Sequence, residues 1–88
     1  MTTGLNFGQA IEALKSGKRV ARTGWNGKGM WLEIVQGDYY NPNSNDASMF
    51  ALGYTKLPWT GMKTADDCFV PWLASQTDIL AEDWQIVE

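Results

Sequence analysis

Residue types that could carry out chemistry are concentrated in two short stretches of this sequence. Arg22 precedes the turn 24–29, which holds three glycines, a tryptophan and a lysine. The second stretch, 72–78, joins an indole to four polar side chains, those of Ser75, Gln76, Thr77 and Asp78. A guanidinium binds phosphate through paired hydrogen bonds, an indole stacks on a flat base, and polar groups orient a small ligand. Both stretches are therefore candidates for binding a small molecule.

Arg22 also has a structural explanation. Val20 and Arg22 share one face of an expected strand, so Arg22 lies at the rim of the core if Val20 points inward. A guanidinium in that position needs a partner. An internal carboxylate, that of Asp78 or Asp83, is slightly favoured over a ligand phosphate.

The turn 24–29 and the stretch 72–78 also have structural explanations. The turn 24–29 lacks the spacing of a phosphate-binding P-loop, and Asn26-Gly27 suits an ordinary hairpin turn. Trp25 favours a ligand, because an indole at a turn is expected to have few core neighbours and offers a stacking surface. The stretch 72–78 suits a local network of caps around Asp78 as well as it suits a pocket.

The residue types exclude several kinds of catalytic and metal site. The sequence has no histidine, which removes Ser-His-Asp and Cys-His catalysis and every histidine-ligated metal site. Its one cysteine, Cys68, follows Asp66-Asp67 at the start of an apolar run and is most simply a core residue. No pair of carboxylates is selected by its spacing, and Asp78, Glu82 and Asp83 do not match a calcium loop. These residue types single out no catalytic residue, metal site or cofactor site.

Length and composition predict one small domain, residues 1–88, that associates with itself. A chain of 88 residues and 9.8 kDa buries only about 60–65% of its unfolded surface. Five tryptophans are more than such a core easily hides with every indole N–H satisfied. Some are expected at a ligand site or between subunits, and a core filled with tryptophan is the alternative at about even odds.

Charge and hydropathy exclude other partners. The net charge of −3 argues against binding to DNA or RNA, and no apolar run is long enough to span a membrane. The N-terminus lacks the pattern of a signal peptide, so an intracellular domain is expected. Residues 15–28 contain five bases and no acid, whereas residues 66–88 contain six acids and no base. These two segments are expected mainly to neutralise each other.

The elements that must position these residues follow from periodicity. A helix is predicted over 6–17, with an Asn6 N-cap, a capping box with Gln9 and a Gly17 stop. Strands are predicted over 18–22, 30–35 and, weakly, 47–52, with a polar loop over 41–46.

The C-terminal half reads as a connection over 54–61 and a tight hairpin of 62–65 with 68–70. Pro71 then limits that strand or marks a sheet edge. An irregular stretch over 72–82 follows, in which Ser75 and Asp78 are spaced like the start of a helical turn. A last strand is predicted over 84–87. One N-terminal helix on a mostly antiparallel sheet is an α+β domain.

Two blocks of this sequence resemble a family of small phage and prophage proteins, the second type of Thoeris anti-defence protein. The first block is formed by 7–15, 20–22 and 24–28, and the second by 62–66, 70–78 and 80–84. The resemblance covers the chain except for a variable middle, about 37–58.

The resemblance implies a non-catalytic sponge in the cytoplasm of an infected bacterial host. Family members sequester cyclic ADP-ribose isomers (gcADPR among them) made by bacterial TIR-domain enzymes, some hold cyclic oligonucleotides at a separate site, and they form homotetramers with pockets between subunits. It implies ligand-binding roles for Phe7, Arg22, Trp25, Asn26, Gly27, Trp72, Ser75, Gln76, Thr77 and Asp78.

The sequence departs from the family at Asp67, where glycine is usual, and at Gly29-Met30-Trp31. The first departure bears on the type of hairpin, and the second could alter the shape of the pocket. An enzyme that degrades the signal and a phage protein-interaction or structural module remain the alternatives.

Overall fold

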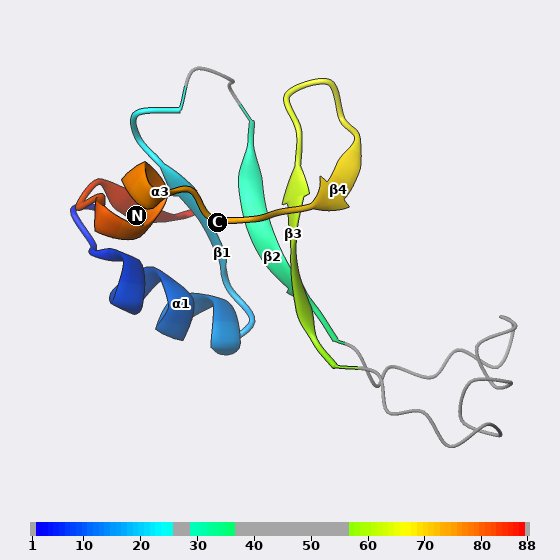
Figure 1. Cartoon of the computed structure of the whole chain (residues 1–88), viewed down its shortest axis with the longest axis horizontal. Helices are drawn as coiled ribbons and strands as arrows, with labels where there is room; N and C mark the ends of the chain where they lie inside the picture. Colours follow the sequence, from blue (N-terminus) through cyan, green and yellow to red (C-terminus); the bar gives the residue numbers. More distant parts are fainter. Residues whose placement is uncertain (1, 26–28, 37–56, 88) are drawn as a thin grey trace, which may run out of the picture.

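The computed structural model describes residues 2–25, 29–36 and 57–87 of the chain. In these ranges the elements are α1 (Phe7–Lys15), β1 (Arg19–Arg22), β2 (Trp31–Val35), β3 (Trp59–Lys63), β4 (Phe69–Pro71), α3 (Gln76–Leu80) and β5 (Trp84–Val87). The strands form one antiparallel sheet in the order β4-β3-β2-β1-β5 (Figure 1). The predicted α+β architecture is confirmed.

Helix α1 forms where its capping signals place it. The Asn6 side chain accepts a 2.8 Å hydrogen bond from the Gln9 amide, and the Gln9 side chain accepts one of 2.9 Å from the Asn6 amide. This reciprocal pair satisfies two donors that a helix start leaves unpaired. Gly17, with a φ of 86°, provides the left-handed residue after the helix. The predicted helix is confirmed, and its outermost residues are the caps.

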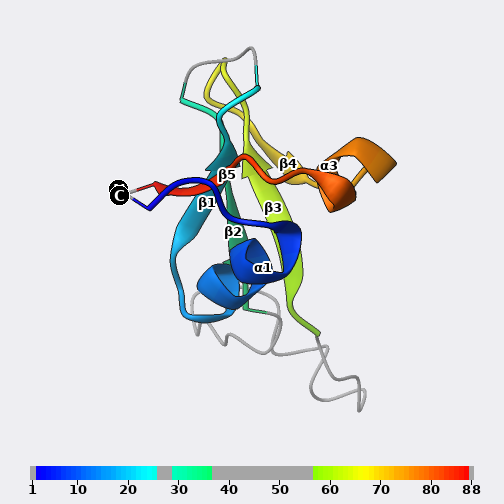
Figure 2. The ribbon, with the colours of Figure 1, turned by 90° about the vertical axis from the view of Figure 1, so that its left-hand side faces the viewer.

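The core lies between α1 and the helix-facing side of the sheet. Ala10 and Leu14 of α1 pack with Val20 of β1, Leu32 of β2 and Trp84 of β5. Strand residues alternate between faces, so Val20, Leu32 and Trp84 all point to the side of the sheet that α1 covers. Figure 2 shows α1 lying across the strands on this side.

The two ends of the chain lie side by side. Leu5 and Trp84 exchange a pair of backbone hydrogen bonds of 2.9 and 3.0 Å, and the Ile86 amide donates to the Thr2 carbonyl at 2.8 Å. The N-terminal segment therefore lines the outer edge of β5, and Figure 2 shows the two termini together.

The C-terminal half confirms the hairpin and corrects the connection predicted before it. Strand β3 begins at Trp59, which pairs with Val35, so 59–61 is strand and not connection. Residue Pro58, which cannot donate a ladder hydrogen bond, immediately precedes the strand. Pro71 ends β4 at the sheet edge, as predicted. Asp67 takes a left-handed φ of 65° in the hairpin turn, a conformation that glycine adopts more readily than other residues.

Cys68 was predicted as a core residue and this is wrong: its side chain is exposed. The apolar run it begins belongs to the edge strand β4, whose three residues are all exposed. The predicted loop 41–46, the weak strand 47–52, Asn26 and Gly27 lie outside the described residues.

Candidate functional site

An aromatic cluster centred on Trp84 lies on the helix-facing side of the sheet. The ring of Trp84 is fully buried, and its centroid is 5.5 Å from that of Trp25, 5.6 Å from that of Phe7 and 6.0 Å from that of Trp72. These rings come from the turn after β1, the start of α1 and the segment before α3. Trp84 thus holds together side chains from both sequence blocks.

Trp25 was expected to have few core neighbours, and that expectation is wrong. It packs edge-on against Trp84 and lies 6.4 Å from Trp72, also edge-on. Edge-to-face contacts of this kind are favourable by about 0.5–1.5 kcal/mol beyond area burial. Trp25 and Trp72 nevertheless remain partly exposed, so each keeps some surface for a ligand.

Helix α3 begins with a second capping box. Ser75 is the N-cap, and its hydroxyl accepts a 3.2 Å bond from the Asp78 amide. The Asp78 carboxylate in turn accepts from the Ser75 amide at 3.0 Å and hydroxyl at 2.8 Å. Asp78 is buried, whereas Gln76 and Thr77 are exposed on the first turn. The predicted network of caps around Asp78 is confirmed.

Arg22 connects this cap to the last turn before β5. Its Nε donates to Asp83 at 2.9 Å and its Nη1 donates to Asp78 at 2.9 Å. The Asp83 carboxylate also accepts from the Gly24 amide at 3.0 Å, which ties the start of the 24–29 turn to the same group. The internal partner predicted for Arg22 is confirmed, and it consists of both carboxylates.

These contacts shift the ionisation of all three groups toward the charged forms. Hydrogen bonding to Asp83 and then Asp78 raises the pKa of the Arg22 guanidinium. The bond from Arg22 lowers the pKa of Asp83. Burial acts to raise the pKa of Asp78, but bonds from Ser75 and Arg22 outweigh it, so that pKa is also lowered.

The Arg22–Asp78 contact is where the two charged segments meet. Arg22, from the basic segment, pairs with acids of 66–88 as predicted. Arg19 and Lys15 do not follow that pattern, because they pair with Glu33 and Glu12. Neutralisation between the segments is therefore established for one of the described bases, Arg22.

The aromatic cluster and the polar network share one hydrogen bond. The Trp84 indole N–H donates to the Asp78 carbonyl at 3.0 Å. The structure thus brings together most of the predicted ligand residues: Phe7, Arg22, Trp25, Trp72, Ser75 and Asp78. Sequence reasoning missed Trp84, whose signal was only its place as the first residue of an alternating strand.

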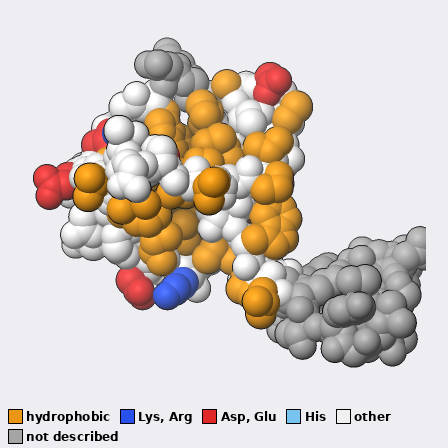
Figure 3. Space-filling view, viewed as in Figure 1, with side chains coloured by type: hydrophobic (Ala, Val, Ile, Leu, Met, Phe, Trp, Pro, Cys, Tyr) orange, Lys and Arg blue, Asp and Glu red, His pale blue; other side chains and the backbone are white. Residues whose placement is uncertain are grey.

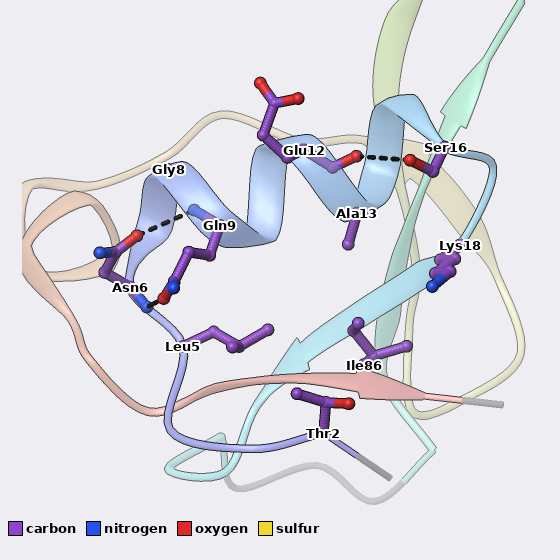
Figure 4. Close-up of a pocket in the computed structure, with 10 residues that line it drawn as sticks. All are labelled: Thr2, Leu5, Asn6, Gly8, Gln9, Glu12, Ala13, Ser16, Lys18 and Ile86. Carbon is purple, nitrogen blue, oxygen red and sulfur yellow. Dashed lines mark hydrogen bonds between the residues drawn. The ribbon is translucent and has the colours of Figure 1, made fainter.

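Two grooves among the described residues lie elsewhere. A groove of about 520 Å³ is lined by α1, the N-terminal segment and Ile86 (Figure 4). A second groove, of about 340 Å³, shares Lys18 and Ile86 with the first. None of the ten predicted ligand residues lines either cavity. A ligand at the Trp25–Trp72 surface would meet an open surface in one copy of the chain.

Apolar side chains stand exposed beside this site. Leu73, which follows Trp72, is 92% exposed, and Leu80 of α3 is 77% exposed. Figure 3 shows hydrophobic side chains gathered on this side of the molecule, around α3 and over the sheet. We call Leu73, Ile79 and Leu80 the α3 patch.

The described residues contain no cluster of three metal-ligating side chains. Among the helices of the described ranges, none is long and apolar enough to cross a membrane.

Comparison with known proteins places this arrangement in a family. Residues 5–87 match the model of the Thoeris anti-defense 2-like domain. The chain belongs to this family. It is 45% identical, over 94 aligned positions covering 99% of each chain, to the Thoeris anti-defense 2 protein of Bacillus phage SP01. The family resemblance inferred from the two sequence blocks is confirmed. The matched range, 5–87, includes every described residue of the site.

The lowered pKa values of Asp78 and Asp83 predict acid sensitivity. Both carboxylates are stabilising when ionised, so their contribution is complete above the unfolded pKa of about 3.9 and is lost as pH falls through the lower folded values. We expect a Tm that is nearly constant from about pH 7 to 5 and that falls below about pH 4. Asp83→Asn should lower Tm at pH 7 and show a shallower loss in acid.

Circular dichroism melts across pH 2.5–7 measure this difference. Glu12→Gln, an exposed change outside the network, is the control and should follow the wild-type profile. Parallel acid profiles for wild type and Asp83→Asn would contradict the role assigned to the network.

Proposed function

We propose that this chain is a phage anti-defence protein that binds and sequesters a cyclic ADP-ribose-type signal made by the TIR-domain enzymes of Thoeris, in the cytoplasm of the infected host. The observation that carries the proposal is the convergence of Trp25 and Trp72 beside the Arg22–Asp78 pair in a member of the Thoeris anti-defense 2-like family. These two indoles and this network come from separate sequence blocks, and the fold joins them.

Each group has a role that its chemistry suits. The partly exposed faces of Trp25 and Trp72 stack on the adenine, at about 1–3 kcal/mol for each stacked base. Asn26, Ser75, Gln76 and Thr77 bond to the sugars, and Gly27 lets the turn approach the ligand closely. A sub-micromolar sponge needs about 8 kcal/mol or more, which stacking on two indoles and charged hydrogen bonds can supply together.

A phosphate-binding role for Arg22 requires a change in its existing contacts. Its guanidinium already donates to two carboxylates, so a ligand pyrophosphate there must share it with Asp83 or displace that contact. The Gly24 amide, which also bonds Asp83, would be released in the same event. Ligand binding at Arg22 is therefore coupled to the last turn before β5.

The α3 patch favours assembly as a homotetramer in which neighbouring copies complete each site. Leu73, which follows Trp72, and Leu80 of α3 are both exposed, and monomeric proteins rarely leave large apolar patches uncovered. A second copy over this patch would enclose the otherwise open Trp25–Trp72 surface. Whether cyclic oligonucleotides occupy a separate site in this chain is a prediction from the family alone.

Sequestration without turnover is tested by recovering the ligand. The tagged chain is purified from cells that produce TIR-derived signals, denatured, and its released small molecules are identified by mass spectrometry. We expect an intact cyclic ADP-ribose isomer at up to one molecule per site. Linear breakdown products accumulating with time would instead indicate an enzyme, and an empty protein that binds a host polypeptide would indicate an interaction module.

Removing either indole should weaken binding more than folding. Trp25→Ala and Trp72→Ala are each expected to weaken binding by about 1–3 kcal/mol, measured by titration calorimetry with the recovered isomer. Thermal melts without ligand provide the comparison, and Thr3→Ala, a change at an exposed residue outside the aromatic cluster, is the control. Wild-type affinity in both variants would refute the stacking assignment, and loss of folding in both would make the indoles core residues.

Arg22→Lys separates the structural from the ligand-binding role of Arg22. Lysine keeps the charge but cannot donate to Asp78 and Asp83 in the same fork. Since a hydrogen bond to a charged group contributes about 1.5–3 kcal/mol, the unliganded variant should melt lower than wild type. If Arg22 also holds phosphate, saturating ligand raises its Tm by less than it raises that of wild type. An undiminished ligand-induced shift would show that Arg22 serves the fold alone.

A further inference from the structure

Asp83 accepts hydrogen bonds from each of the three residues that precede Trp25. The Arg22 Nε donates to its Oδ1 at 2.9 Å, and the Gly24 amide donates to its Oδ2 at 3.0 Å. The Thr23 hydroxyl also donates to Oδ2, at 3.3 Å, and the Thr23 amide donates to the Asp83 carbonyl at 3.0 Å. Trp25 closes the turn, because its own amide donates to the Arg22 carbonyl at 3.3 Å. The backbone that leads to Trp25 is therefore held by one residue from the far end of the chain.

Gly24 leaves open the space that the Asp83 carboxylate occupies. A Cβ at Gly24 would lie 2.9 Å from Asp83 Oδ2, closer than real Cβ atoms approach other atoms. The backbone of Gly24 does not take a left-handed φ, so its conformation alone does not require glycine. The carboxylate packed against this position is thus the structural reason for a glycine here.

The residue after Asp83 holds the side chain of Trp25. Trp84 is fully buried, and its ring centroid lies 5.5 Å from that of Trp25 at an interplanar angle of 79°. Trp84 is itself fixed by its pairing with Arg22 in the sheet. Asp83 therefore holds the backbone before Trp25, and Trp84 holds its ring. An indole fixed in this way loses little freedom when a base stacks on its exposed part.

Asp83 can keep these contacts while a phosphate approaches Arg22. Nε of Arg22 donates to Asp83 and Nη1 donates to Asp78, whereas Nη2 has no hydrogen-bond partner among the described residues. Because a guanidinium carries five N–H donors, a phosphate can share it through Nη2. Displacing Asp83 instead would release the backbone before Trp25 at the moment when the stacking surface is needed.

We propose that Asp83 is a positioning residue for signal binding: it holds Trp25 in the orientation that stacks on the base, and it stays bonded to Thr23 and Gly24 in the complex. This inference rests on the proposed function and deepens it, since it adds a residue that acts on the ligand through Trp25. It also selects sharing over displacement as the way in which a phosphate reaches Arg22.

Gly24→Ala is the decisive variant. Its methyl group should push Oδ2 away from the Gly24 amide, while Oδ1 can still accept from Arg22. With cyclic ADP-ribose and its isomer gcADPR as probes, titration calorimetry should show binding weakened by roughly 5- to 150-fold, which is equivalent to losing one stacked base. Asp83→Ala should act in the same direction. In a chain that already carries Trp25→Ala, Gly24→Ala should weaken binding no further, because the residue it acts through is gone.

A second measurement needs no ligand. Closely spaced indoles give an exciton signal in far-ultraviolet circular dichroism, and the part lost in Trp25→Ala belongs to Trp25. Gly24→Ala and Thr23→Val should each lose some of that part, whereas Thr23→Ser keeps the hydroxyl and should resemble wild type. Glu12→Gly is the control, because it lowers Tm through helix propensity at an exposed position and should leave the signal and the affinity unchanged.

Three results would overturn the proposal: wild-type signal and affinity in Gly24→Ala, an additive loss in the double variant, or tighter binding in Asp83→Ala, which would make the carboxylate a competitor of the ligand. If Gly24→Ala does not fold, Thr23→Val and Thr23→Ser decide by the same two measurements. A wild type that yields no signal from cells and binds neither probe would refute sequestration. The exciton signal would then decide by itself whether Asp83 positions Trp25.

Discussion

The burial of the Trp84 indole, with its N–H hydrogen-bonded, is the interaction on which the rest of this structure depends. An indole can be fully enclosed only if its N–H finds an acceptor, and here the acceptor is the Asp78 carbonyl. That single bond fixes β5 relative to α3. It also positions Asp78 so that its carboxylate accepts hydrogen bonds from the Ser75 hydroxyl and from the Arg22 guanidinium. Phe7, Trp25 and Trp72 then pack around a ring whose position is already determined.

The same network serves the fold and the proposed site, and this sets a physical limit on both. Arg22 is oriented by Asp78 and Asp83, which gives a rigid guanidinium at the edge of the aromatic cluster. Rigid groups lose little freedom when a ligand binds. The cost is that each carboxylate also opposes an incoming anion. Discrimination between ligands should therefore depend strongly on how their phosphates are oriented toward this fork.

Local signals in the sequence were sufficient for most elements. Asn6 with Gln9 and Ser75 with Asp78 both form the capping boxes that their spacing indicates, and Pro71 lies at a sheet edge. The predictions were wrong where contacts between distant segments determine the structure. Strand β3 extends back to Trp59 because β2 supplies partners for it, and Cys68 is exposed because it adjoins β4, an edge strand whose residues are all exposed. For the site, residue types identified the two blocks, but only tertiary packing shows that Trp25 contacts Trp84 and that Arg22 has two internal partners.

The pairing of β1 with β5 has a consequence for the timing of function during synthesis. Arg22 and Asp83 are separated by 61 positions, and Arg22 pairs in the sheet with Trp84. The β1 strand therefore remains without one of its neighbours, and the aromatic cluster without its centre, until nearly the last residue has been translated. Contacts so distant along the chain form slowly, because the intervening loop must close first. A ribosome-bound fragment would contain both tryptophans of the proposed site and still lack the site. An anti-Thoeris protein with this fold therefore has its aromatic cluster complete only when translation of the chain is nearly finished.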